Sequence, residues 1–285
     1  MNIHMVCKTA SIRVLKLCIA LLDAGHSPTI TCGEVSGLHV ELFNKIPRYQ
    51  TARADVTHIH AGVNYVHKWP ESPHVIDLHD YPERFKGVLS DSARLVVSST
   101  GYAEIMRDWP STVVYNKVPA SLWPAQRYRT REKLDITALV SATSTKEAIR
   151  DYREVHEMLQ GNLHVFEATF ESDLDTRMFV FHPRPYGTML KDLTMYRFGW
   201  AGAANSRTSS HQVVTHKYWE YIAAGVIPIT WRSDEMEYLP WSVDHGDIVL
   251  DSKVTSPLRE NDPRTLDHDI PALISAYEQA IGDYK

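Results

Sequence analysis

The sequence predicts an α/β protein with two doubly wound domains, each built around a parallel sheet. Its length of 285 residues, about twice that of a typical domain, is the first observation behind this prediction. The second is that short β-branched and aliphatic runs alternate with amphipathic helical segments, as in βαβ units. The third is the stretch Lys117–Lys133, which is rich in proline and arginine and has no periodicity. We interpret it as a linker between domains of residues 1–125 and 126–285.

The first half contains short apolar runs that are typical of buried strands. They are Asn2–Val6, Thr29–Cys32, Val56–His60, His74–Leu78, Leu95–Ser98 and Thr112–Tyr115. The clearest helix is Ser11–Ala24, in which an apolar stripe runs from Ile12 to Leu22. Gly25 follows as the residue expected to end this helix.

The second half repeats the alternation of strands and helices. Its expected strands are Ile136–Ser141, His164–Ala168, Met178–His182, Phe198–Ala201, Val226–Thr230 and Asp247–Leu250. Its expected helices are Thr145–Leu159, Gly187–Met195, Thr215–Ala224 and Pro271–Asp283. This order favours a second parallel sheet covered by helices.

Composition excludes several protein classes. Hydrophobic residues make up 44% and charged residues 23%, which is too apolar for a disordered, collagen-like or coiled-coil chain. Three cysteines at spacings of eleven and fourteen suit neither a disulfide framework nor a zinc site, so a reducing cytoplasm is expected. The N-terminus does not resemble a secretory signal. The apolar stretch Ile12–Leu22, interrupted by Arg13 and Lys16, is too short for a transmembrane segment.

Charge is distributed unevenly between the two halves. Residues 1–130 carry 14 lysines and arginines against 11 acidic residues, and residues 131–285 carry 16 against 24. The basic excess of the first half could meet an anionic partner, although ordinary scatter of surface charge explains it as well.

The glycines argue against two large classes of α/β enzyme. No two of the 13 glycines are adjacent or separated by one residue, and none precedes a lysine. The turn of dinucleotide-binding domains and the phosphate loop of P-loop enzymes both need such patterns. An NAD-dependent dehydrogenase and a P-loop kinase are therefore disfavoured.

The most informative segment is His216–Ile229, a predicted helix that ends at Gly225 and leads into a strand. Lys217 and Glu220 are three residues apart and share one helix face. A carboxylate there can accept two ribose hydroxyls, and a lysine near the helix start favours phosphate. An exposed Lys-Glu pair on the surface is the alternative interpretation.

The segment resembles the K-x-x-E-Y-x-A-x-G-x-P-V signature of a large family of retaining glycosyltransferases that includes sucrose synthases and bacterial mannosyltransferases. Weaker similarities lie in the family's order at Asp55–His60, Ile76–Asp80, Val97–Glu104 and Val113–Pro119. The resemblance implies the GT-B fold, in which two Rossmann-like domains face a cleft. It also implies a nucleotide-sugar donor, expected to be UDP-linked, on the second domain and a hydroxyl acceptor on the first.

The resemblance also implies roles for individual residues. Glu220 takes the place of the glutamate that holds the ribose, and Gln212 replaces the carboxylate that normally touches the donor sugar. Ser141 and Lys146 stand where the family has an arginine and a lysine for the departing diphosphate. The hydroxyl of Thr143 can assist them. The missing arginine would come from Arg184 or Arg207, each of which could also be a plain surface residue.

Histidines near two strand ends are further candidates. His79 and Asp80 follow a strand, where open α/β sheets place ligands, and could contact the sugar or the acceptor; a capping or core role is the alternative. His58 and His60 share one face of a strand and could bind a metal, but a structural role is favoured. We expect no metal site, because no partnering cysteine or carboxylate cluster is visible beside them, and fixed positive groups can stabilise a leaving diphosphate without a cation.

The expected activity is therefore transfer of a sugar, with retention of configuration, from a nucleotide sugar to a hydroxyl group, with no other cofactor. Compact enzymes of this family occur in viruses that glycosylate hydroxylated DNA bases. A hydroxymethylated base of viral DNA in the host cytoplasm is thus one expected acceptor, and Tyr65, His67 and Trp69 could stack on it or merely pack in a loop. A lipid, a glycan or a small molecule is the alternative acceptor. A non-catalytic nucleotide-sugar-binding protein is the alternative class, because Gln212 and Ser141 depart from the family pattern.

Overall fold

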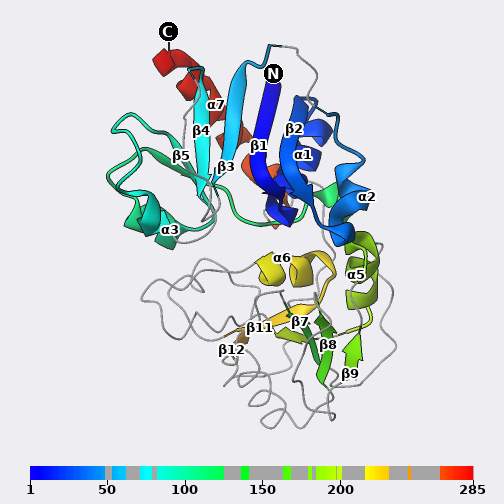
Figure 1. Ribbon diagram of the computed structural model, residues 1–285. Coiled ribbons are helices and arrows are strands. Elements are labelled where there is room, and N and C mark those ends of the chain that lie inside the picture. The colour runs from blue at the N-terminus through cyan, green and yellow to red at the C-terminus, as the bar shows by residue number, and fades with distance from the viewer. Residues whose placement is uncertain are drawn as a thin grey trace. The chain divides into compact units, whose positions relative to one another are not determined.

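The computed structural model describes residues 1–48, 53–61, 71–78, 82–124, 136–140, 163–167, 179–181, 184–196, 198–200, 216–230, 243–244 and 264–284. The chain divides into two compact units (Figure 1). The first contains Met1–Leu122 together with Glu260–Lys285, and the second contains Trp123–Arg259.

The first unit is built on a parallel sheet with the strand order β2-β1-β3-β4-β5-β6. These strands are β1 (Asn2–Ala10), β2 (Ser27–Val35), β3 (Val56–Ala61), β4 (His74–Leu78), β5 (Leu95–Val97) and β6 (Ser111–Val113). The expected strand positions are confirmed, and β1 and β2 extend beyond them. The order reverses beside β1, because β2 lies on one side of it and β3 on the other.

Short helices connect these strands. They are α1 (Ile12–Asp23), α2 (Val40–Phe43) and α3 (Thr100–Ile105), with 3₁₀-helices η1 (Gly37–His39), η2 (Pro82–Phe85) and η3 (Ala120–Leu122). Ser11 caps α1, because its side chain accepts the backbone N–H of Val14. Gly25, at φ 80°, follows the end of this helix in a conformation that favours glycine.

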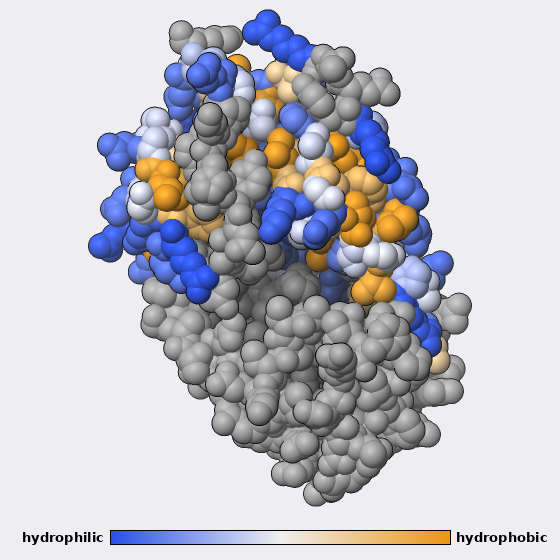
Figure 2. All heavy atoms as spheres, viewed as in Figure 1, coloured by the Kyte–Doolittle hydropathy of each residue, from blue (hydrophilic) through white to orange (hydrophobic). Residues whose placement is uncertain are grey.

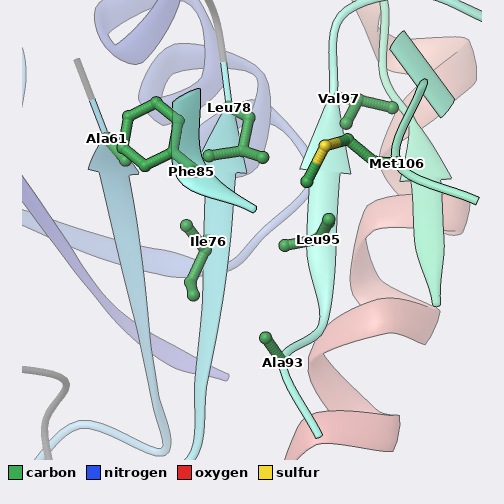
Figure 3. Packing of buried hydrophobic residues seen from close by; sticks show 8 residues of the cluster. All are labelled: Ala61, Ile76, Leu78, Phe85, Ala93, Leu95, Val97 and Met106. Atoms are coloured by element: carbon green, nitrogen blue, oxygen red, sulfur yellow. The ribbon is translucent and has the colours of Figure 1, made fainter. Parts of the chain in front are cut away.

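Apolar side chains from β4 and β5 form the core on one face of this sheet (Figure 3). Ile76 and Leu78 of β4 lie beside Leu95 and Val97 of β5, because alternate residues of a strand point to the same face. Phe85, Met106 and their neighbours complete the cluster. This packing fixes the two strands whose ends lead to residues 79–81 and to α3.

The C-terminal segment returns to the first unit, which differs from the expected division at residues 125 and 126. It contains η7 (Leu266–Asp269) and α7 (Ile270–Tyr284), and α7 contacts β3, β4 and β6 (Figure 1). Leu273 and Tyr277 of α7 are fully buried. The sequence alone could not predict this return, because the apolar stripe of α7 would suit packing against the sheet of either unit.

The second unit has a parallel sheet with the order β12-β11-β10-β7-β8-β9. Its elements are β7 (Ile136–Val140), β8 (Leu163–Glu167), β9 (Phe179–Phe181), α5 (Tyr186–Leu193), β10 (Phe198–Trp200), α6 (His216–Ala223), β11 (Ile227–Thr230) and β12 (Val243–Asp244). The helix expected at Thr145–Leu159 and the strand expected at Asp247–Leu250 lie outside the described residues. The fold class is thus confirmed as α/β with two parallel, Rossmann-like sheets.

The described part of the surface is mixed in character. Figure 2 shows orange residues scattered among blue ones on one face of the first unit. Such scatter is ordinary for a protein surface. Among the helices that the structure describes, none is long and apolar enough to cross a membrane. Cys7, Cys18 and Cys32 are free thiols.

Candidate functional site

Glu220 lies in the interior of the second unit, on α6. Its exposed fraction is 3%, and its neighbours Tyr218, Trp219 and Tyr221 are buried as well. Lys217, one turn earlier, is only half-buried. The alternative of an exposed Lys-Glu surface pair therefore fails for Glu220. Burying a carboxylate is costly unless polar groups meet it, so a group of this kind calls for a partner or a ligand.

Tyr186, the first residue of α5, lies close enough to this carboxylate for the two to interact electrostatically. It is 4% exposed, and burial, followed by the nearby Glu220 carboxylate, raises the pKa of its hydroxyl well above the ordinary value. Tyr186 was not among the expected site residues. The sequence carried no signal for it, because only the packing of α5 against α6 brings the two side chains together.

Arg184 lies just before α5 and is exposed. Its Nη1 donates to Asp192 Oδ2 at 2.5 Å, which ties it to the helix that carries Tyr186. A diphosphate role for Arg184 stays a prediction. The remaining expected residues of this unit lie outside the described residues: Ser141, Thr143, Lys146, Arg207 and Gln212.

In the first unit, a buried ion pair joins α1 to β4. Arg13 Nε donates at 2.8 Å to Asp77 Oδ2 and Arg13 Nη2 donates at 2.8 Å to Asp77 Oδ1. Arg13 is 1% and Asp77 0% exposed. Arg13 Nη1 also donates to the Val114 carbonyl at 2.9 Å and to Asn116 Oδ1 at 2.8 Å. All three guanidinium nitrogens thus donate hydrogen bonds, and pairing with additional hydrogen bonds of this kind is what buried charges require.

Lys16 and Lys117 add two more buried cations around the same loop. Lys16 Nζ donates to the Asn116 carbonyl at 2.6 Å. Lys117 Nζ donates to Asp269 Oδ1 at 2.5 Å, next to the start of α7. Arg13 and Lys16, the two charges that interrupt the apolar stretch Ile12–Leu22, are therefore both buried. Both side chains point inward and hold the loop that follows β6.

His58 and His60 also surround Asp77, from β3. His60 Nδ1 lies 3.1 Å from Asp77 Oδ2, and His58 Nε2 lies 3.4 Å from the same oxygen. His58 Nδ1 lies 2.8 Å from the Tyr277 hydroxyl of α7. The two histidines have these partners within the protein, as a structural role requires. No group of three His, Cys, Asp or Glu residues in the described ranges is arranged to hold a metal ion.

Electrostatics keep Asp77 charged and His58 neutral. Burial alone would raise the pKa of the Asp77 carboxyl, but Arg13, His58 and His60 more than offset it and hold that pKa well below its usual range. Burial lowers the pKa of His58, and Asp77 opposes this only in part. His79 and Asp80, two and three residues beyond Asp77, lie outside the described residues. The strand that leads to them is thus fixed by a charged cluster.

Two D-x-D carboxylate pairs, a pattern that metal-dependent glycosyltransferases use to hold diphosphate, qualify the expectation of a metal-free site. Asp173 and Asp175 form one pair, outside the described residues. Asp267 and Asp269 form the other. Asp269 pairs with Lys117, and Asp267 Oδ2 accepts the Ala120 N–H at 2.7 Å. The described pair therefore serves the structure of the first unit.

Comparisons with known proteins find matches among solved structures only. No protein-family model matches the sequence, and no curated protein matches it. Among solved structures, AviGT4, a glycosyltransferase involved in avilamycin A biosynthesis, is 10% identical with a TM-score of 0.65 over 99% of this chain and 98% of that one. A trehalose-6-phosphate protein from E. coli bound with UDP-2-fluoro glucose is 9% identical with a TM-score of 0.53, covering 100% and 95%.

An α-glucosyltransferase in complex with UDP-glucose and DNA containing an abasic site is 13% identical with a TM-score of 0.52, covering 99% and 92%. These likenesses extend over the whole of this chain although so few residues are identical. At such identities they establish architecture rather than activity. The chain has the GT-B fold, with two Rossmann-like domains, as the sequence resemblance predicted.

Proposed function

We propose that this protein is a retaining glycosyltransferase that uses a nucleotide sugar as its donor. The observation that carries the proposal is Glu220, a carboxylate that is 3% exposed on α6, directly before the turn into β11. Its place in the Lys217–Pro228 segment, whose family counterpart holds the ribose, supports a role in accepting the two ribose hydroxyls.

The donor is proposed to be UDP-linked. Two of the structures with the same fold were described with UDP-2-fluoro glucose and UDP-glucose bound. Lys217 is half-buried in the first turn of α6, where the helix dipole and the ammonium group both favour a phosphate. Tyr186 would hold the Glu220 carboxylate in place for the ribose.

The chemical step requires stabilisation of the charge that develops on the leaving diphosphate. Lys217, Lys146 and an arginine, Arg184 or Arg207, are proposed to supply it, with the hydroxyls of Ser141 and Thr143. Fixed groups of this kind lower the barrier because they need no reorganisation during the reaction. Gln212 is proposed to contact the donor sugar. His79 and Asp80 are proposed to act on the acceptor side.

The acceptor is proposed to be a hydroxymethylated base of DNA. The support is the shared fold with an α-glucosyltransferase in complex with UDP and a DNA 13-mer containing a HMU base, which is 13% identical with a TM-score of 0.53. The larger TM-score of AviGT4, 0.65, favours a small-molecule acceptor as the second candidate. Both acceptors present the hydroxyl group that the reaction needs.

Donor binding is the test that separates this proposal from other functions of the fold. Binding of UDP-glucose is measured by calorimetry for the wild type, Glu220→Ala and Glu220→Gln. We expect Glu220→Ala to weaken binding by about 1.5–3 kcal/mol, because charge-assisted hydrogen bonds are lost. Glu278→Ala, at an exposed position of α7, is the matched control. Unchanged affinity in folded Glu220→Ala would contradict the assignment.

Turnover then distinguishes an enzyme from a binding protein and one acceptor from another. Release of UDP from UDP-glucose is followed with hydroxymethylated DNA, unmodified DNA and a panel of hydroxylated small molecules and glycans. We expect release with hydroxymethylated DNA alone. Release only with a small molecule would favour the second candidate, and binding without release in any mixture would favour a non-catalytic nucleotide-sugar-binding protein.

A further inference from the structure

Three polar side chains of the first unit form a hydrogen-bonded series. Ser11 Oγ lies 3.1 Å from His60 Nε2, and His60 Nδ1 lies 3.1 Å from Asp77 Oδ2. Ser11 precedes α1, His60 lies near the end of β3, and Asp77 lies in β4. Segments that are far apart in the sequence therefore place a hydroxyl, an imidazole and a carboxylate in order.

The charge on Asp77 sets the direction of these hydrogen bonds. Because its pKa lies well below the usual range, the carboxylate can only accept. His60 Nδ1 therefore carries a proton and donates a hydrogen bond to Asp77. In the neutral ring this leaves a lone pair on Nε2, so the Ser11 hydroxyl donates its proton to His60.

Ser11 is the member of the series that a bound molecule can reach. It is half-buried, whereas His60 is 6% and Asp77 0% exposed. Ser11 Oγ also accepts the backbone N–H of Val14 at 3.4 Å. Among the hydrogen bonds between described residues, this leaves one lone pair of Oγ for another donor, such as a substrate hydroxyl.

The position of the series in the sheet is that of a ligand site. The strand order reverses beside β1; Ser11 directly follows β1, and His60 is the second-last residue of β3, so the two meet at the carboxyl ends of these strands. Open α/β sheets bind ligands outside the carboxyl ends of strands at such a reversal. Geometry and topology thus indicate the same place independently.

We infer that Ser11, His60 and Asp77 form a proton relay that serves the acceptor hydroxyl; this inference rests on the function proposed above. The acceptor oxygen bonds to the anomeric carbon on the face from which the diphosphate departs, so that the configuration is retained; the bond from that carbon to the diphosphate oxygen breaks, and its electron pair leaves with the nucleoside diphosphate. The acceptor proton moves to Ser11 Oγ while the Ser11 proton moves to His60 Nε2. The imidazolium returns its proton to the diphosphate or to water as the products leave.

The three residues have different tasks in this relay. Ser11 is the catalytic residue, because it touches the acceptor. His60 holds the proton behind it, and Asp77 is a positioning residue that sets the tautomer. The demand on the relay is small, since the acceptor hydroxyl becomes acidic as its oxygen bonds to the sugar.

A serine-directed reagent tests the relay without any acceptor. Diisopropyl fluorophosphate reacts with a polarised serine: the Oγ–P bond forms, the P–F bond breaks, fluoride leaves and the imidazole takes the serine proton. The full chain is treated, and the labelled sites and rates are read by peptide mass spectrometry. Ser36 is the matched control, because it is also half-buried and caps η1 by accepting the Leu38 N–H at 3.4 Å.

We expect Ser11 to be labelled about 100-fold faster than Ser36, and this advantage to disappear in His60→Gln. A purely structural capping serine would show no such dependence on His60. Equal labelling of the two serines in the wild type would overturn the relay. Thermal melting of each variant shows whether it is folded, and the wild-type comparison decides the question even where His60→Gln does not fold.

Transfer assays with UDP-glucose and hydroxymethylated DNA test the link to the reaction. Ser11→Ala should lower kcat about 100-fold with an unchanged KM for the donor, and Ser11→Thr, which keeps the hydroxyl, should recover most of it. Fast labelling of Ser11 together with an unchanged kcat in Ser11→Ala would show that the relay takes no part in sugar transfer. If the wild type labels at Ser11 but transfers sugar to no acceptor, the proposed function fails, and the relay's role in transfer fails with it.

Discussion

At the scale of single residues, the first unit depends on one buried carboxylate. Asp77 is surrounded by Arg13, His58 and His60, and each of these also contacts a different part of the unit. Arg13 reaches the loop after β6, His58 reaches α7, and His60 reaches Ser11 before α1. The loss of Asp77 would therefore leave a buried guanidinium without its counter-ion and release three elements at once.

We predict that Asp77→Asn lowers the free energy of unfolding by about 3–5 kcal/mol at pH 7, because breaking a buried pair leaves an uncompensated charge. Chemical denaturation followed by circular dichroism measures the change. Asp283→Asn is the control, since its ion pair with Arg94 lies at the surface and should contribute little. Comparable losses in both variants would contradict the prediction.

Repeating the chemical denaturation at several pH values tests whether the charge of Asp77 is what stabilises the fold. The pKa of Asp77 in the folded state is well below its ordinary value of 3.8, so its ionised form stabilises the fold fully above that pH. This contribution is lost as the pH falls below 3.8 toward the folded-state pKa. The stability difference between the wild type and Asp77→Asn should therefore shrink in that acid range. A difference that grows on acidification would show that the charge of Asp77 is not the cause.

At the scale of elements, α6 is held against β10 by close packing. A Cβ atom placed on Gly199 of β10 would lie 2.6 Å from the ring of Tyr221, which is fully buried on α6. Glycine is thus required because the helix approaches the strand so closely. The packing matters for function, since α6 carries Lys217 and Glu220 and must be placed accurately for a nucleotide.

We predict that Gly199→Ala lowers the free energy of unfolding by about 1–3 kcal/mol, because the buried tyrosine ring has to move. It should also weaken UDP-glucose binding, since any shift of α6 displaces Glu220. Gly87→Ala, where an added Cβ meets nothing within 4 Å, is the matched control. Thermal melting and calorimetry measure the two effects. An unchanged melting temperature in Gly199→Ala would show that the contact relaxes without cost.

At the scale of the whole molecule, the chain returns to the unit in which it began. Val118 and Thr265 pair as a parallel β-bridge, and the Leu266 N–H donates to the Val118 carbonyl at 3.2 Å. The Lys117–Asp269 ion pair lies beside them. Asp269 keeps a raised pKa because burial outweighs the lysine, so ionising this carboxyl costs some stability. These contacts therefore hold together the segment with which the chain leaves the first unit and the segment with which it returns.

We predict that sugar transfer persists in EDTA. The described D-x-D pair, Asp267 and Asp269, is engaged with the protein itself, and the proposed groups on the diphosphate are cations. UDP release is measured with and without chelator. Complete loss in EDTA, restored by Mn²⁺ or Mg²⁺, would contradict the prediction and direct attention to Asp173 and Asp175. Asp173→Asn would then be expected to abolish the restoration by metal.

The sequence by itself determined the strands β1 to β11, the helices α1, α5, α6 and α7, and their order. β-branched runs such as His74–Leu78 and the apolar stripe of α1 are local patterns, and local patterns specify strands and helices directly. The motif around Glu220 was recognisable for the same reason, since helix, turn and strand are contiguous there. The likeness of the whole chain to GT-B structures agrees with the fold that this motif implied.

Only the tertiary structure decided which distant groups meet. Arg13 and Asp77 are 64 residues apart, His58 and Tyr277 are 219 apart, and neither pairing has a local signal. The sequence showed charges within apolar segments, at Arg13, Lys16 and Asp77, but not that Arg13 and Asp77 compensate each other or that Lys16 reaches the Asn116 carbonyl. The return of α7 and the approach of Tyr186 to Glu220 were hidden for the same physical reason. Burial and charge pairing depend on the arrangement of elements in space, which periodicity along the chain does not encode.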